Sequence, residues 1–280
     1  MSGGRLVVIG TPVGNLGDLS PRAVEALRAV DVLACEDTRR TGRLLAHVGV
    51  PAPELLRLDA TVERDRTPAL LDRIRGGDVV GLVSDAGMPG ISDPGAHLIG
   101  AARAADLDVE VVPGPVAAAV ALVASGLGCD TGRFTFEGFL PRRGRDRAER
   151  LAGIASSSCV SVVYESPHRV ADTVADLRGV CGGDRAVAVC RELTKLYEEV
   201  WTGTLDAAVD HLAEREPRGE YVVVVDAAPP AEPAPDVDLL QALQAELAGG
   251  ATRRDAARSV AERFGVGVNR VKRLVDDGDD

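Results

Sequence analysis

Short apolar runs rich in β-branched residues alternate with longer amphipathic stretches along the first half of the chain. This alternation predicts strands connected by helices, which fold as a parallel or mixed sheet covered by helices. Each run ends in Gly, Pro or acidic residues, and ligands usually bind at such strand ends. The predicted strands are residues 6–9, 31–35, 78–84 and 109–112.

The same alternation starts again near Arg133, with predicted strands at residues 161–164, 186–190 and 221–225 and helices after Pro167 and Thr204. Residues 227–236, AAPPAEPAPD, contain too much proline for a helix or a strand and predict a semi-rigid linker. Three amphipathic helical pieces follow, separated by glycines. We therefore expect an α/β domain at 1–127, a second at 128–226, a linker at 227–236 and a helical segment with an acidic tail at 237–280.

Local signals predict where several helices begin and end. Ser20-Pro21 and Thr67-Pro68 each place a capping hydroxyl before a proline at the first helical position. Gly49 and Gly76-Gly77 predict helix ends. The helical pieces after the linker resemble a helix-turn-helix unit. A helical appendage that packs on the core or mediates dimer contacts is the alternative.

Composition and charge limit the functional classes. The 280 residues predict about two domains, and an aromatic share of 3% predicts cores of Ala, Val and Leu without aromatic platforms for stacked bases. A formal net charge of -11 argues against a protein that coats nucleic acid unspecifically. Arginines cluster at 133–150 and 253–273, where local RNA contact and a solvated surface are equally good interpretations.

The chain shows no feature of a membrane or secreted protein. No apolar run is long enough to span a bilayer, and the first residues lack a signal-peptide pattern, so we expect a cytoplasmic protein. The five cysteines are an odd number in apolar contexts and predict reduced core residues. The four histidines are scattered, so no metal site is expected.

Three loops after predicted strands carry candidate binding chemistry. Residues 10–18, GTPVGNLGD, allow close approach to a ligand, but their spacing fails G-x-G-x-x-G and no G-K-[ST] follows, which disfavours a Rossmann or P-loop nucleotide site. Residues 84–95, SDAGMPGISDPG, combine prolines that fix φ with glycines that free the backbone for a polar ligand. In residues 112–119, VPGPVAAA, small side chains leave room for an adenine or a methionine tail, or for tight helix packing.

A fourth signal is CEDTRR at residues 35–40, which directly follows a predicted buried strand. A helix cap explains Asp37 or Thr38. Glu36 and Arg39 together at a strand end are more typical of a positioned functional site.

Seven successive motifs in this chain resemble those of the ribosomal RNA small subunit methyltransferase I family: GTPVGNLGDLSPRA, DVLACEDTRRTGRLL, LVSDAGMPGISDPG, VPGPVAA, FEGFLPRRG, YESPHR and CRELTKLYEE. That family is similar in fold to the tetrapyrrole methylases, which implies two α/β domains of a class III methyltransferase. The resemblance implies S-adenosylmethionine (S-adenosyl-L-methionine) as the cofactor, commonly in a homodimer. The implied substrate is the 2′-hydroxyl of a cytidine in the decoding region of small-subunit (16S) ribosomal RNA, presented as RNA or as the assembled small subunit.

The resemblance also implies a set of cofactor-binding residues, which are Pro12, Asp85, Ala86, Gly87, Met88, Ile91, Ser92, Pro115, Val116, Ala117, Ala118, Tyr164, Glu192 and Leu193. This chain departs from the family pattern in two places. Met88 stands where Thr is usual, and residues 59–63, DATVE, replace a segment that commonly carries His and Asn. The second change removes the basis for a role of that segment in RNA positioning.

Methyl transfer from a sulfonium requires in-line alignment and a group that takes up the hydroxyl proton. The catalytic candidates are Glu36, Asp85 and Lys195. Lys195 is one of only two lysines, and a desolvated lysine can shift its pKa whereas arginine cannot, although a phosphate contact explains Lys195 equally well. The candidate RNA-binding residues are Arg39, Arg142, Arg143, His168 and Arg169, with simple solvent exposure as the alternative.

Two other functions are compatible with these patterns. A tetrapyrrole (precorrin-type) C-methyltransferase shares the fold and cofactor but acts on a macrocycle carbon, and the arginine-rich residues 141–150 favour RNA over it. From another class, the chain could be a nucleic-acid-binding regulator that uses the C-terminal helices and a degenerate cofactor domain.

Overall fold

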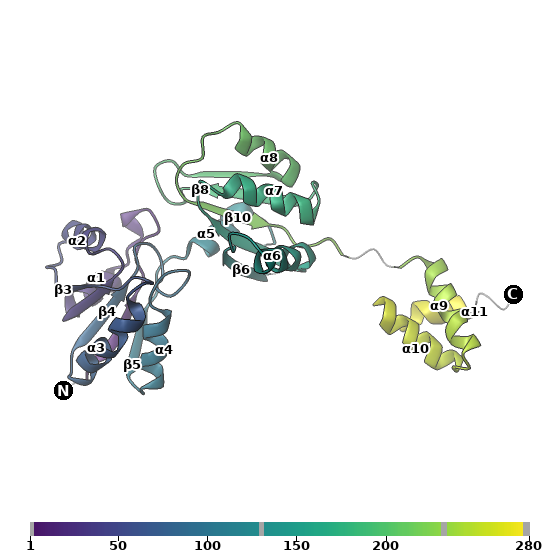
Figure 1. Ribbon diagram of the computed structural model, residues 1–280, viewed down its shortest axis with the longest axis horizontal. Coiled ribbons are helices and arrows are strands. Elements are labelled where there is room, and N and C mark those ends of the chain that lie inside the picture. Colours follow the sequence, from purple (N-terminus) through teal and green to yellow (C-terminus); the bar gives the residue numbers. More distant parts are fainter. Residues whose placement is uncertain (1–2, 129–131, 231–233, 277–280) are drawn as a thin grey trace. The chain divides into compact units, whose positions relative to one another are not determined.

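The structure is a computed structural model that describes residues 3–128, 132–230 and 234–276. It forms two compact units, Met1–Ala228 and Pro229–Asp280, and each is described by itself (Figure 1). The larger unit contains two five-stranded sheets. This arrangement confirms the predicted α/β class.

The first sheet is entirely parallel, with the strand order β3-β2-β4-β1-β5. Strands β1 and β4 are neighbours in this sheet, but the connection from β1 to β2 and the connection from β4 to β5 run in opposite directions. A topological switch point therefore lies between β1 and β4. In open α/β sheets, ligands bind outside the carboxyl ends of the strands at this point. The strands are β1 (Arg5–Ile9), β2 (Val32–Cys35), β3 (Glu54–Arg57), β4 (Val79–Val83) and β5 (Asp108–Val112).

Helices cover both faces of the first sheet, and β1 shows how the sequence specifies this. Leu6 and Val8 pack in the core formed with α3 (Glu63–Arg75) and α4 (Ala96–Ala104). Val7 and Ile9 pack in the core formed with α1 (Pro21–Ala29) and α2 (Thr38–His47). Successive strand side chains point to opposite faces, so this continuous apolar run supplies both cores.

The second sheet is mixed, with the order β6-β7-β10-β8-β9, in which only β6 and β7 pair in parallel. One face packs against α6 (Arg145–Ser156), α7 (Val170–Cys181) and α8 (Leu205–Ala213), and the other packs against α5 (Ala117–Ser125). The strands are β6 (Phe134–Phe139), β7 (Val160–Glu165), β8 (Ala186–Arg191), β9 (Glu199–Thr204) and β10 (Tyr221–Val225). Helix α5 thus follows the last strand of the first sheet in sequence but packs on the second sheet.

The smaller unit confirms the three predicted helical pieces as α9 (Asp236–Ala248), α10 (Arg253–Phe264) and α11 (Val268–Asp276). Leu239, Leu243, Val260 and Val271 are buried in a core of their own. The Thr252 hydroxyl caps α10 by accepting from the N–H of Asp255 at 3.2 Å. In the part of the chain that the structure describes, no helix has the length and hydrophobicity needed to cross a membrane.

All seven predicted strands are confirmed, and the structure adds β3, β6 and β9. These three are edge strands, and their side chains are only partly buried. An edge strand needs no long β-branched run to fill a core on both faces, so the hydrophobic pattern gave no signal for them.

One predicted helix start is confirmed and the other is wrong. The Ser20 hydroxyl accepts from the N–H of Ala23 at 3.1 Å and caps α1. Helix α3 instead begins at Glu63, with Pro68 inside it. The Asp59 carboxylate closes the preceding turn by accepting from the N–H of Thr61 at 2.9 Å, and the Thr67 hydroxyl donates to the carbonyl of Glu63 at 2.8 Å inside the helix.

Candidate active site

The loops that follow β1 and β4 are locked together through their backbones. The N–H of Thr11 donates to the carbonyl of Gly87 at 2.8 Å, and the N–H of Gly87 donates back to the carbonyl of Thr11 at 3.2 Å. The buried hydroxyl of Thr11 also donates to the carbonyl of Ser84 at 3.2 Å. Two loops that are more than 70 residues apart in sequence (|i−j| = 73) therefore form one rigid wall.

Two glycines bring the loop after β5 against the same wall. A Cβ on Gly10 would lie 2.5 Å from Cα of Gly114 and 2.7 Å from Sδ of Met88, so no larger residue fits without a backbone shift. The N–H of Gly114 donates to Sδ of Met88 at 3.1 Å. The methionine that departs from the family pattern thus contacts the neighbouring loop, and the three glycine- and proline-rich loops singled out in the sequence lie together.

These loops border a cavity of about 330 Å³, called here the apolar cavity. Its far side is formed by the second sheet, through residues near the ends of β7 and β10. Eight of the predicted cofactor-binding residues line it: Ala86, Gly87, Met88, Ile91, Ser92, Val116, Ala117 and Tyr164. A volume of this size is in the range of small-molecule binding sites.

Tyr164 connects the second sheet to α5 at this cavity. Its hydroxyl oxygen accepts from the N–H of Ala118 at 3.0 Å, at the start of a helix that has no side-chain cap. The ring packs edge-on against Phe136 and Phe139, with centroid distances of 4.9 and 5.7 Å. Burial and the negative charge of Asp93 raise the pKa of Tyr164, so its hydroxyl stays protonated at neutral pH.

A second cavity of about 450 Å³, the polar cavity, adjoins the first. Val13, Ala86 and Glu220 line both. The remaining lining residues of the polar cavity are Thr11, Pro12, Gly14, Leu16, Arg40, Thr41, Arg43, Leu44, Ser84, Asp85 and Lys195. Two predicted cofactor-binding residues, Pro12 and Asp85, therefore face this cavity.

The other predicted cofactor-binding residues lie outside both linings. Ala118 and Leu193 are buried together in the core between α5 and the second sheet. The carbonyl of Pro115 lies against Gly87, 3.3 Å from where a Cβ would stand. Glu192 holds the ammonium of Lys195 at 2.8 Å and so acts on the polar cavity through that side chain.

Three carboxyl groups near the two cavities have raised pKa values. Burial raises the pKa of Asp93 to about 7, helped by the negative charges of Glu36, Asp85 and Glu220 and opposed by the Ser84 hydroxyl. Burial and the charge of Asp85 also raise the pKa of Glu36. Burial raises the pKa of Asp85 against the guanidinium of Arg40, which lies 3.3 Å away.

Asp93 is the functional candidate that the sequence analysis missed. It lines the apolar cavity, whereas Glu36 lies in neither lining. The signal was present in the SDPG sequence that closes the loop after β4, but Asp85 was equally visible in the same loop. Only the folded loop shows that Asp93 lines the apolar cavity and that burial raises its pKa to about 7.

Glu63 explains how the loop carrying Asp93 is held. Its buried carboxylate accepts from the N–H groups of Gly95, His97 and Leu98 at 3.0, 2.9 and 3.1 Å. It therefore caps α4 from α3, where no side chain of the helix itself does so. The residue that departs from the family pattern in segment 59–63 thus has a structural role directly behind the cavity wall.

Lys195 is held as a cation. Burial lowers its pKa, but hydrogen bonds at 2.8 Å from Nζ to Glu192 and to Glu220 outweigh burial, and the net shift is upward. A lysine with a raised pKa stays charged and cannot take up a proton at neutral pH. This side chain is suited to bind an anion or orient a substrate.

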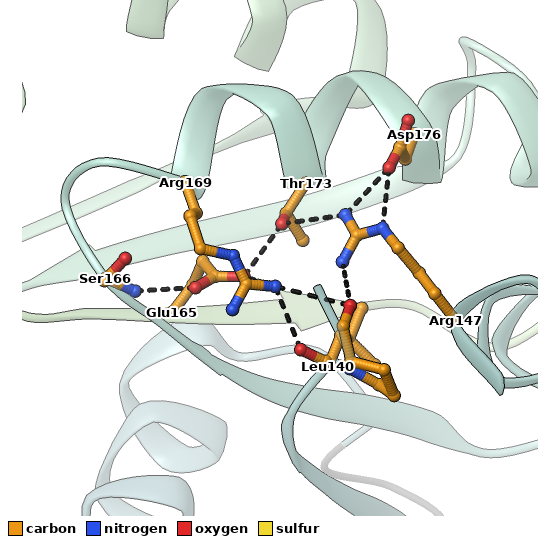
Figure 2. Close-up of polar contacts among 8 residues, drawn as sticks. Leu140, Arg147, Glu165, Ser166, Arg169, Thr173 and Asp176 are labelled. Carbon is orange, nitrogen blue, oxygen red and sulfur yellow. Dashed lines mark hydrogen bonds and ion pairs between the residues drawn. The ribbon is translucent and has the colours of Figure 1, made fainter. Parts of the chain in front are cut away.

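Four of the five predicted RNA-binding side chains are exposed, and the fifth is bonded inside the protein. Arg39, Arg142, Arg143 and His168 are exposed. Arg169 is engaged inside the protein: its guanidinium contacts the buried carboxylate of Glu165 at 3.2 Å and donates to the carbonyl of Leu140 at 2.9 Å (Figure 2).

The same network holds the backbone that precedes Arg142. Arg147 donates to the carbonyl of Pro141 at 2.9 Å and to Asp176 at 2.7 Å, and Thr173 donates to Glu165 at 2.8 Å (Figure 2). Together these bonds hold the turn that precedes Arg142 against α7. Arg142 and His168 line an open hollow of about 520 Å³ over this network.

Known proteins share both the sequence and the fold of this chain. The family model for tetrapyrrole (corrin/porphyrin) methylases matches residues 5–209. A protein named ribosomal RNA small subunit methyltransferase I in Synechocystis sp. is 43% identical over 92% of this chain and 92% of its own length, and its counterpart in Pseudomonas aeruginosa is 41% identical over 96% and 95%. The chain belongs to the ribosomal RNA small subunit methyltransferase I family.

Solved structures agree with this membership at the level of the fold. The methyltransferase CobJ has a TM-score of 0.62 at 22% identity and covers 80% of this chain and 95% of its own. Uroporphyrin-III C-methyltransferase from Thermus thermophilus, solved with S-adenosylhomocysteine, has a TM-score of 0.58 at 20% identity, over 80% and 97%. Like its family, the protein is an S-adenosylmethionine-dependent methyltransferase.

The apolar cavity fits this donor. Gly87 and the alanines Ala86 and Ala117 leave space for a planar base and its ribose, and the lining is predominantly apolar. We therefore propose that the apolar cavity binds the methyl donor.

Proposed function

We propose that the protein transfers the methyl group of S-adenosylmethionine to the 2′-hydroxyl of a cytidine in 16S ribosomal RNA, near the decoding region. The proposal is supported by the names of the relatives and by the motifs that run through the whole chain. The observation that carries it in this structure is the shared lining of the two cavities at Val13, Ala86 and Glu220. A substrate in the polar cavity would border the donor directly.

The polar cavity has the groups that an RNA backbone requires. Arg40, Arg43 and Lys195 line it, and Arg40 and Arg43 are exposed. Cationic side chains fix the register of a nucleic acid through its phosphates. The remaining predicted contacts, Arg39, Arg142, Arg143 and His168, extend the proposed RNA surface, whereas we assign Arg169 mainly to the internal network.

We propose Asp93 as the group that takes up the proton. When bound, the donor supplies a methyl group activated by a positively charged sulfur. The ribose oxygen forms a bond to the methyl carbon while the carbon–sulfur bond breaks toward sulfur, and the hydroxyl proton passes to the carboxylate. A base with a pKa of about 7 is suited to this step at neutral pH.

The two other carboxylates then have supporting roles. Glu36 and Asp85 raise the pKa of Asp93 through their negative charges. Asp85 also accepts from the N–H of Asp37 at 3.1 Å and pairs with Arg40, so it ties the loop after β2 to the loop after β4. Lys195 orients the acceptor as a fixed cation.

Assembly and location are also proposals. We propose a cytoplasmic homodimer, with domains at 1–127 and 128–226 and a helical segment at 237–280 joined by the linker 227–236. Phe134 supports self-association because it is 41% exposed on the edge strand β6. Light scattering in solution tests the dimer, and a monomeric mass would contradict it.

The decisive experiment incubates the purified protein with labelled S-adenosylmethionine and small ribosomal subunits that lack the modification. We expect label on one cytidine ribose, located by mass spectrometry of the digested RNA. Label on a base, or on no RNA, would refute the proposed acceptor. A coloured macrocycle that copurifies with the protein and accepts the methyl group would instead support a tetrapyrrole C-methyltransferase.

A further inference from the structure

The turn between β8 and β9, residues 192–198, has an unusually constrained backbone. Glu192 and Thr194 adopt left-handed conformations, with φ values of 51° and 64°, although neither is glycine. Such residues persist only where the surroundings fix them, often at functional sites. Here the N–H of Lys195 donates to the carbonyl of Glu192 at 3.0 Å, and the N–H of Glu198 donates to the carbonyl of Lys195 at 3.1 Å.

The turn is also pressed against the loop after β1. A Cβ on Gly14 would lie 2.4 Å from Cγ of Lys195 and 2.8 Å from Oγ1 of Thr194. Among the described residues, Oγ1 of Thr194 is one of two buried side-chain polar atoms without a hydrogen-bond partner. Gly14 is thus the residue that permits this contact, and the contact places the turn at the rim of the polar cavity.

The tip of this fixed turn presents apolar side chains to solvent. Leu196 is 88% exposed and Tyr197 is 71% exposed, which makes Tyr197 the most exposed aromatic residue in the described part of the chain. In a flexible loop, apolar side chains can turn away from solvent. The backbone hydrogen bonds of this turn instead hold Leu196 and Tyr197 in exposed positions. Large apolar groups fixed in an exposed position beside a binding site are typical of a contact surface.

The position of Tyr197 relative to Lys195 indicates what it contacts. Lys195 lines the polar cavity, and two residues of chain span at most about 7 Å. A group that touches Tyr197 is therefore a near neighbour of the group in the cavity. In single-stranded RNA, the neighbour of one nucleotide is the base of the next, and every base has a face that stacks on an aromatic ring.

We propose that Leu196 and Tyr197 form a platform for an unpaired RNA base adjacent to the methylated nucleotide. This inference rests on the proposed function and adds a second contact site to it. It also departs from the expectation, drawn from the low aromatic content, that no aromatic platform is present. One well-placed tyrosine is enough for a single base.

The test compares Tyr197→Ala with Tyr197→Phe, which keeps the ring, and with Val180→Ala, a control that shortens an exposed apolar side chain on α7. For each protein, kcat/KM is measured on unmodified small subunits and the affinity for S-adenosylmethionine by calorimetry. We expect Tyr197→Ala to lower kcat/KM about tenfold, in line with the energy of one stacked base, and to keep the donor affinity. Tyr197→Phe and Val180→Ala should match the wild type.

Three results would overturn the platform. They are an unchanged kcat/KM for Tyr197→Ala, a loss of donor affinity, or a shift of that variant to a lower mass in light scattering, which would make Tyr197 a subunit contact. Failure of the proposed function looks different, because then the wild-type protein itself would place no label on the RNA.

Discussion

The two cavities of the active site lie side by side but are built by different means. The wall of the apolar cavity is fixed by backbone hydrogen bonds between Thr11 and Gly87 and by glycines in direct contact. The polar cavity is lined by side chains that pair with one another, such as Arg40 with Asp85 at 3.3 Å and Lys195 with Glu220 at 2.8 Å. Arg40 keeps 59% of its side chain exposed.

This difference supports the proposal that the two cavities have different tasks. A wall made of backbone contacts needs little ordering when a small ligand binds, which favours affinity for the donor. Exposed ion pairs contribute little to stability, so a phosphate can replace a carboxylate partner at low cost. Changes at the apolar wall should therefore act on donor binding, and changes at the polar cavity should act on the acceptor.

Gly114→Ala should have the largest effect. The added Cβ would lie 2.7 Å from Cα of Gly10 and force the loops after β1 and β5 apart. We expect donor binding to fall below detection in calorimetry and methyl transfer to be lost. Gly100→Ala is the matched control, because a Cβ there meets nothing within 4 Å and alanine favours helix α4. Wild-type donor affinity in Gly114→Ala would mean that the wall is not rigid.

Asp93→Asn should have the next largest effect and should separate chemistry from binding. Removing the proposed base is expected to lower kcat about 100-fold, at the lower end of the range for general base catalysis, while donor affinity changes little. In the wild type, kcat/KM should fall as the pH drops through about 7, because Asp93 gains a proton there in the free enzyme. The variant should lose this dependence, and a retained acidic limb would assign the base elsewhere.

Glu36→Gln provides the matched comparison for that pH profile. Glu36 raises the pKa of Asp93 through its charge, so its removal should move the acidic limb to lower pH. The rate at pH 8 should be nearly unchanged, since Asp93 is ionised there in both proteins. An acidic limb that stays in place would show that Glu36 does not act through Asp93.

The comparison of the two cavities also shows which of their features could be predicted from the sequence. The loops of the apolar cavity were predictable because glycine and proline act locally: Gly87 and Gly114 are where backbone groups must meet, whatever the rest of the fold does. Asp93 was not predictable as distinct from Asp85, because its burial and its place in the cavity lining depend on how the folded loop packs. Glu63 was missed for the same reason, since it caps a helix 32 residues further along the chain (|i−j| = 32).

Lys195→Ala should have an intermediate effect, confined to the acceptor. The raised pKa of Lys195 keeps it cationic, so its loss should raise KM for the small subunit about tenfold without changing donor affinity. Lys195→Arg keeps the charge and should retain most of the affinity. If Lys195→Ala lowered donor affinity instead, the lysine would belong to the donor site.

Removal of residues 237–280 should have the smallest effect on the chemistry. These residues form a unit with its own hydrophobic core, and the two cavities are lined only by residues of the larger unit. We expect a severalfold weaker binding of small subunits in filter assays, with unchanged donor affinity and an unchanged melting transition of the larger unit. If the full-length and truncated proteins bind equally at high salt, the arginines of α10 account for the lost binding, because contacts to phosphates are sensitive to salt. Full activity of the truncated protein would reduce the helical unit to an appendage and leave RNA recognition to the polar cavity.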